Sequence, residues 1–170
     1  AGARTQFIVD ADRLMPLADF WAENNLDAII PAGVKPAAEY NGDIYNIPMN
    51  VHVVGFFYNP KVMAAAGVTA MLTTWDEFLA LCETLKAAGV APIALGSMNR
   101  WPAQFWFDYM VSYTAGADYR QKLMAGEAAY NDPEVVTAME TWKSLVDAVY
   151  FVEDANAYDW TDAADQVTNG

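Results

Sequence analysis

Two groups of polar and aromatic residues have types and spacings that suit the binding of a sugar. Asn50 and His52 stand two residues apart in a stretch that reads as a β-strand, so both side chains are expected on the same face. Each offers hydrogen-bond donors and acceptors in a fixed plane. Trp101 stands at a predicted loop-to-helix junction, after Asn99 and one helical turn before Gln104. A flat apolar ring beside amide groups matches a sugar, which has an apolar face and a rim of hydroxyl groups.

Each of these residues also has a purely structural interpretation. His52 fits a hydrogen-bonded histidine of the core, and Trp101 fits an aromatic residue that packs at the start of a helix. The residue types alone leave both interpretations open. For Trp75, Trp106 and Trp142, a position in the core is the favoured interpretation.

The sequence contains no recognisable catalytic or metal-binding motif. His52 is the single histidine, and the motifs of serine hydrolases, P-loop NTPases, dinucleotide-binding enzymes and zinc proteases do not occur. An acidic, solvated surface explains the 22 acidic residues better than a catalytic carboxylate pair does. Cys82 is alone, and its place on a predicted helix indicates a buried thiol. We therefore expect a protein that is not an enzyme and that needs no metal or cofactor.

Composition and charge exclude further classes of protein. The 170 residues suit one compact domain or slightly more, and 55% of them are hydrophobic, which is too many for a disordered chain. The net charge is −13, whereas binding to nucleic acid or anionic lipid requires clustered lysine and arginine. No apolar stretch is long enough to cross a membrane, and no basic, apolar leader opens the chain.

The hydrophobic pattern predicts a helix-rich α/β fold. Thr74 and Glu77 form the clearest local signal, a capping box at the start of a helix that Gly89 ends. Asp132 is predicted to cap another helix, which begins at Pro133. The other predicted elements are an extended piece at Gln6–Val9, a helix from Pro16, a turn at Asn41–Asp43, a strand at Ile44–Tyr58, a helix at Pro60–Gly67, a short strand at Ala91–Leu95, a buried helix from Trp101, and short helices at Tyr119–Met124 and after Thr161.

Three stretches, taken in order, resemble one family. They are YNGDIYNIPMNVHVVGFFYNPKVMAAAGV, TTWDEFLALCETLKAAGVAPIALG and WPAQFWFDYM. The pattern is similar to that of the family 1 extracellular solute-binding proteins of bacterial ABC importers, the sugar-binding group related to maltose-binding protein. The family's G-x-x-Y-x-x-P strand, T-W-x-E-F helix and A-G-x-x-P-I-A-L-G segment match Gly42–Pro48, Thr74–Phe78 and Ala88–Gly96. The resemblance covers roughly residues 14–155.

The resemblance implies part of a two-lobe periplasmic-binding-protein fold of type II, mainly the helical portion of the second lobe. Residues 1–43 would be a remnant of the first lobe, 44–59 a crossover or hinge strand, and 60–170 an incomplete second lobe. It also implies a monomer, periplasmic or extracellular, that captures a sugar between the lobes. The partner would be the transmembrane permease of an ABC importer.

The resemblance also assigns roles to Asn50, His52 and Trp101. In the glucose- and glucoside-binding branch, a segment like N-x-H faces the ligand, which carries over to Asn50 and His52. The family's stacking aromatic carries over to Trp101. Val53 stands where relatives often have a basic residue. Full members are about twice as long or more, so the chain resembles an internal fragment.

Three alternatives remain open at this stage. In the first, the protein binds a solute other than a sugar, such as a polyol, a polyamine or a glycerophosphodiester. In the second, the protein is a carbohydrate-active enzyme, which requires two carboxylates to flank the sugar. In the third, it is a structural helical module, for which replacing Trp101 would change no small-molecule interaction.

Overall fold

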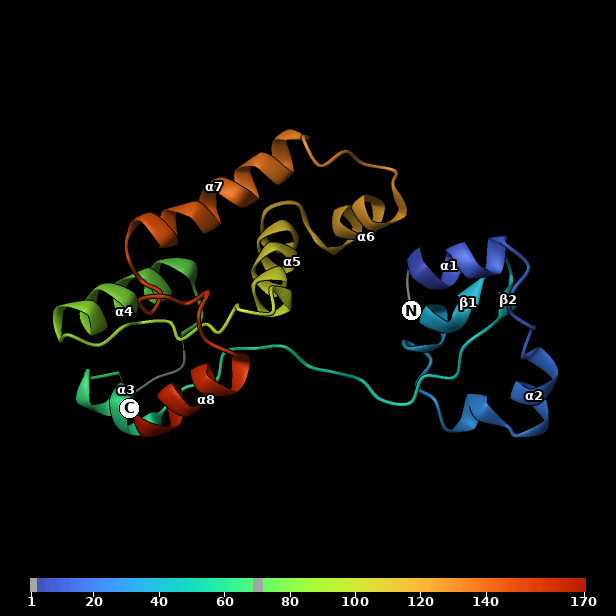
Figure 1. Cartoon of the computed structure of the whole chain (residues 1–170), viewed down its shortest axis with the longest axis horizontal. Coiled ribbons are helices and arrows are strands. Elements are labelled where there is room, and N and C mark those ends of the chain that lie inside the picture. The colour runs from blue at the N-terminus through green and yellow to red at the C-terminus, as the bar shows by residue number, and fades with distance from the viewer. Residues whose placement is uncertain (1–2, 69–71) are drawn as a thin grey trace. The chain divides into compact units, whose positions relative to one another are not determined.

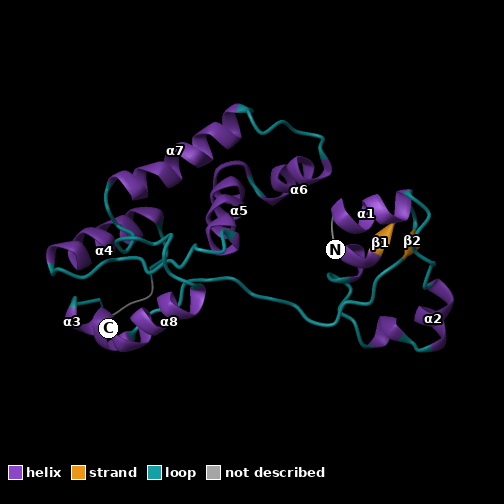
Figure 2. Cartoon of the chain, in the orientation of Figure 1, coloured by secondary structure: helices purple, strands orange, loops and turns teal. Residues whose placement is uncertain are grey.

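The chain forms two compact units, one up to Val53 and one from Val54 to Gly170. The computed structural model describes residues 3–68 and 72–170. Figure 1 follows the chain by residue number, and Figure 2 shows that helices predominate over strands. Each unit has its own cluster of buried apolar side chains.

The first unit is a small arrangement of short elements. It contains the helices α1 (Ala3–Asp10) and α2 (Ala18–Glu23), two 3₁₀ turns at Leu26–Ala28 and Lys35–Ala38, and the strands β1 (Glu39–Tyr40) and β2 (Asp43–Ile44). The strands pair antiparallel across the predicted turn, in which Asn41 and Gly42 both have positive φ. Trp21, Ala38 and Ile44 form its buried core.

Two sequence-based predictions for this unit are wrong. Gln6–Val9, expected to be extended, lies inside helix α1, because a run of only three apolar residues does not separate a strand from a helix. The strand expected over Ile44–Tyr58 is paired only at Ile44, and residues 45–59 contain no assigned helix or strand. A strand needs the ladder hydrogen bonds of a neighbour, and the described residues place none beside this segment.

The second unit is built of helices, and local signals explain where several of them begin. Its helices are α3 (Pro60–Ala65), α4 (Trp75–Ala87), α5 (Trp101–Ala115), α6 (Ala117–Ala125), α7 (Pro133–Asp147) and α8 (Trp160–Asn169). The predicted capping box is confirmed, since the hydroxyl of Thr74 accepts from the Glu77 backbone and the Glu77 carboxylate accepts from Thr74. Helix α7 begins at Pro133 as predicted, but the carboxylate of Asp132 accepts hydrogen bonds from Ala129 N and the Tyr119 hydroxyl.

Helix α5 lies at the centre of this unit, in contact with α6 and α7 (Figure 1). Its buried face consists of Trp106, Met110 and Val111, whereas Tyr109 is half exposed, so the helix is less buried than expected. The short strand predicted at Ala91–Leu95 reduces to one parallel bridge between Ile93 and Phe151.

The core assignments of cysteine and tryptophan agree with the structure. Cys82 is 1% exposed, and burial raises the pKa of its thiol to about 11. Trp106 is buried, and Trp75 and Trp142 pack half-buried against the same core. Among the described residues, no helix is both long and apolar enough to cross a membrane.

Candidate functional site

The loop before helix α5 is fixed by the chain segment before helix α8. A Cβ atom on Gly96 would lie 1.9 Å from the carbonyl oxygen of Asp159, so only glycine permits this approach. The backbone N–H of Ser97 donates to Ala155 O at 2.9 Å, and that of Met98 donates to Tyr158 O at 3.0 Å. These contacts join residues about sixty positions apart in the chain.

Side chains reinforce the same junction. The buried Ser97 hydroxyl donates to Asn156 Oδ1 at 2.7 Å, and Asn99 Nδ2 donates to Asp159 Oδ2 at 3.1 Å. Arg100, which follows, has a φ of 65°, in the region that residues other than glycine rarely adopt. This conformation turns the chain sharply into helix α5.

Two tryptophans face each other where the two segments meet. Trp101 is the first residue of α5, and Trp160 is the first residue of α8. Their ring centroids are 6.3 Å apart with planes inclined by 56°, and the side chains remain 45% and 52% exposed. Single exposed aromatic residues are common, whereas neighbouring exposed aromatic rings are typical of binding surfaces. The pair is therefore an open aromatic corner beside the Asn99–Asp159 hydrogen bond.

Asp159 has a second role at this corner. Its carboxylate accepts from the Trp160 backbone N–H, and its own N–H donates to Asp162 Oδ2, which completes a capping box at the start of α8. The two carboxylates lie where the positive end of the helix dipole stabilises negative charge. Asp159 thus holds Trp160 and Asn99 in place together.

The structure places the predicted residues in two different units. Asn99, Trp101 and Gln104 belong to the second unit, where Asn99 and Trp101 lie at the aromatic corner and Gln104 is exposed on α5. Asn50 and His52 belong to the first unit and are both exposed. Asn50 lines a hollow of about 220 Å³ formed by residues 29–34 and 48–51, whereas His52 does not line it.

The sequence analysis missed Asp159 and Trp160. Both fall in a stretch that it described only as acidic and polar, with a short helix to follow. A partial signal was present, because Trp160, like Trp101, stands at the start of a helix close to a residue with a hydrogen-bonding side chain. Their proximity to Trp101 depends on the pairing of two loops, which no local pattern reveals.

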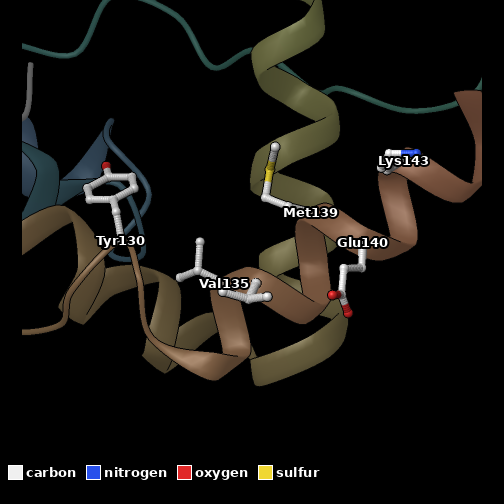
Figure 3. Close-up of a pocket in the computed structure, with 6 residues that line it drawn as sticks. Tyr130, Val135, Met139, Glu140 and Lys143 are labelled. Carbon is white, nitrogen blue, oxygen red and sulfur yellow. The ribbon is translucent and has the colours of Figure 1, made fainter.

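A larger hollow lies elsewhere and contains none of the predicted residues. It measures about 390 Å³ and is lined by Tyr130, Val135, Val136, Met139, Glu140 and Lys143. Figure 3 shows that these side chains project from α7 and from the loop before it. The lining is mostly apolar and lacks the converging amide and hydroxyl groups that orient a polar ligand.

The described residues offer no evident metal site. No group of three or more histidine, cysteine, aspartate or glutamate side chains among them could hold a metal ion. The aromatic corner instead combines apolar ring faces with an amide and carboxylates, which can accept and donate hydrogen bonds around a small polar molecule.

Comparison with known proteins gives a consistent result. A family model described as bacterial extracellular solute-binding protein matches residues 1–170. An uncharacterized ABC transporter extracellular-binding protein of Pyrococcus horikoshii is 31% identical over 100% of this chain and 38% of its own length. A probable sugar-binding periplasmic protein of Mesorhizobium japonicum is 32% identical over 85% of this chain and 34% of its own length.

A solved structure matches as well. The bacterial solute receptor AcbH, described as having an exclusive preference for β-D-galactopyranose, superposes with a TM-score of 0.83 at 30% identity. The match covers 99% of this chain and 42% of the receptor. The expected fold class, a helix-rich part of a solute-binding protein fold, is confirmed. The chain spans little more than a third of the length of these curated relatives.

Proposed function

The chain belongs to the bacterial extracellular solute-binding proteins, and from this premise we propose that its protein binds a sugar for an ABC importer. The proposed protein is a non-catalytic component that acts outside the cytoplasmic membrane, as a monomer, and delivers its sugar to the transmembrane permease. No nucleic acid, membrane insertion or cofactor takes part in this proposal.

The aromatic corner is the observation that carries the proposal. Trp101 and Trp160 present two half-exposed ring faces to which the apolar face of a pyranose can stack. Beside them, the Asn99 amide and the Asp159 carboxylate supply hydrogen-bonding groups for sugar hydroxyls. Ring faces flanked by fixed polar groups are the usual composition of a site for a small polar ligand.

The remaining predicted residues enter the proposal as further ligand contacts. Gln104 lies on the exposed side of the helix that Trp101 begins. Asn50 and His52, which are both exposed, are proposed as further contacts of the sugar. The segment 44–59 that carries them is proposed as the hinge between lobes.

A cationic solute is the second candidate. Asp159 and Asp162 place two carboxylates near the tryptophan pair, and the net charge of the chain is −13. A polyamine would combine ion pairing with contact between its ammonium groups and the indole faces. A sugar remains the better fit because the corner also presents the Asn99 amide, a neutral group that both donates and accepts hydrogen bonds and so suits hydroxyl groups better than ammonium groups.

Tryptophan fluorescence titration of the protein expressed from its complete gene tests the proposal. The panel contains D-galactose, maltose, chitobiose, xylobiose and spermidine. We expect saturable binding of a sugar that Trp101→Leu and Trp160→Leu each weaken about tenfold or more. Tyr130→Leu is the matched control, since it removes an exposed aromatic ring at the α7 hollow. Its affinity should equal that of the wild-type protein.

The other outcomes separate the alternatives. Binding of spermidine alone, weakened by salt, would favour the polyamine candidate. Release of a shorter sugar during the titration would identify an enzyme. A loss of affinity in Tyr130→Leu equal to that in Trp160→Leu would move the site away from the aromatic corner. Asn50→Ala and His52→Ala should each weaken binding about fivefold to 150-fold if they contact the sugar.

A further inference from the structure

The first residues of the second unit are attached to the helices that carry the aromatic corner. The Tyr109 hydroxyl, on α5, donates a hydrogen bond to the carbonyl of Val54. The ring of Phe56 lies 5.3 Å from that of Phe78 and 5.6 Å from that of Trp106, centroid to centroid. The segment 54–59 therefore contacts α5 before it reaches α3.

Asn59, at the end of this segment, forms side-chain hydrogen bonds with two helices, α3 and α8. Its Oδ1 accepts from Lys61 N at 2.9 Å and so caps the start of α3. Its Nδ2 donates to Val167 O at 3.0 Å and to Thr168 O at 3.2 Å, both in the last turn of α8. The carbonyls of a last helical turn have no partner within their own helix, and a donor there is favourable.

The chemistry of this position demands an amide. Asparagine has both an acceptor and two donor hydrogens on a short side chain, whereas serine offers a reach too short for both tasks and aspartate offers acceptors only. Each end of α8 is thus attached to a different part of the unit. Asp159 holds the first turn against the loop at 96–99, and Asn59 holds the last turn against α3.

We propose that Asn59 is a positioning residue for the ligand site. It fixes the direction of α8, a rigid helix of ten residues, and thereby the place of the Trp160 ring relative to Trp101. The inference rests on the proposed function, since it assigns to Asn59 the support of a ring that binds sugar. Asn59 itself touches no ligand in this account.

Two substitutions separate the roles of Asn59. Serine and aspartate are both good N-cap residues, so Asn59→Ser and Asn59→Asp retain the cap of α3. Neither donates to the carbonyls of α8, and the aspartate variant would add a negative charge at the negative end of that helix. A role limited to the cap of α3 predicts that both variants resemble the wild type. The proposal predicts a ranking in which aspartate is worse than serine.

The control is Thr74→Ala, which removes the capping box of α4 and leaves α8 untouched. All variants are made in the protein expressed from its complete gene. Amide hydrogen exchange of residues 160–169 reports on α8 without any ligand. Fluorescence titration with D-galactose, maltose, chitobiose and xylobiose reports on the site. We expect faster exchange in α8 and affinity reduced about threefold to tenfold in Asn59→Ser, with a larger loss in Asn59→Asp.

The outcomes distinguish this inference from the proposed function. Thr74→Ala should lower the melting temperature with unchanged affinity. Faster exchange in α8 with unchanged affinity in both Asn59 variants would overturn the positioning role, and so would wild-type exchange in α8. If the wild-type protein binds none of the four sugars, the proposed function fails, and the exchange measurement still reports whether Asn59 holds α8.

Discussion

The loop at 96–101 is held by hydrogen bonds to residues 155–160, whereas the segment 46–53 forms none with any other described residue. Both carry predicted ligand residues, Asn99 and Trp101 in the loop and Asn50 and His52 in the segment. The loop at 96–101 thus obtains its hydrogen-bond partners within its own unit. The segment contains no assigned helix or strand, and its backbone groups are unpaired among the described residues.

This difference shows what each region needs in order to be rigid. The loop obtains its partners from the same unit, through Gly96 and Ser97, which fit against Asp159 and Ala155. A strand-like segment obtains its partners only from neighbouring strands, because its hydrogen bonds point sideways. The loop is therefore preorganised within its own unit, whereas the geometry of the segment depends on further pairing.

Amide hydrogen exchange should give the largest contrast between the two regions. The amides of Ser97 and Met98 donate to carbonyl oxygens of another loop, so their opening is expected to cost several kcal/mol. The amides of 46–53 should exchange at nearly the rate of an unfolded chain. Mass spectrometry of the 170-residue chain measures both. Slow exchange at 46–53 in the protein expressed from its complete gene would show that further chain pairs with this segment.

Two glycines test how closely the loop at 96–101 packs against the chain before α8. Gly96→Ala would place a methyl group 1.9 Å from the Asp159 carbonyl, and we expect a loss of about 1–3 kcal/mol or more in the free energy of unfolding. Gly55→Ala is the matched control, because a Cβ atom there meets no other atom within 4 Å. Its stability should stay within about 0.5 kcal/mol of the wild type. Urea unfolding of both variants measures the difference, and equal stabilities would contradict the close approach at Gly96.

Local features of the fold could be predicted from the sequence because local chemistry determines them. The capping box at Thr74 and the helix starts at Pro60 and Pro133 each follow from a few adjacent residues. The strand expected over Ile44–Tyr58 could not be judged in this way, since β-branched and aromatic residues favour a strand only where a partner exists. The helix at Gln6–Val9 was missed because its apolar run was too short to show a period.

The residues of the candidate site likewise differ in whether local sequence reveals them. Trp101 and Asn99 were recognisable because an aromatic residue and an amide stood together at a loop-to-helix junction. Trp160 and Asp159 lie about sixty residues away, and their contribution appears only when Gly96 lets the two loops meet. The double role of Asn59 is equally invisible in sequence, because its partners Val167 and Thr168 lie more than one hundred residues away.

Two asparagines test the same difference between the loop at 96–101 and the segment 46–53, through a smaller expected change in the free energy of unfolding. Asn99→Ala removes the hydrogen bond to Asp159 and should cost about 0.5–1.5 kcal/mol of stability. Asn50 is exposed, and its replacement by alanine breaks no side-chain hydrogen bond among the described residues, so stability should stay within about 0.5 kcal/mol of the wild type. Urea unfolding measures both values. Equal losses would mean that Asn50 is as firmly held as Asn99, and the contrast between the two regions would fail.

The smallest expected effect is on the pH dependence of stability and concerns the Glu77 carboxylate. Its hydrogen bonds come from residues adjacent in sequence, whereas those of the loop at 96–101 come from residues about sixty positions away. Hydrogen bonds from the Thr73 backbone and hydroxyl, and from the Thr74 backbone, lower the pKa of Glu77 below its usual value of 4.5. The ionised form is therefore favoured in the folded state, so its stabilisation is complete above pH 4.5 and is lost as the pH falls through the lowered pKa.

Glu77→Gln removes this titration while keeping an acceptor at the same position. Between about pH 5 and about pH 2, the melting temperature of the wild type should fall by slightly more than that of Glu77→Gln. Glu77 is exposed, which keeps the difference small, and Asp76→Asn is the matched control on the same helical turn. Identical pH profiles for all three proteins would show that the capping box holds α4 without the charge of Glu77.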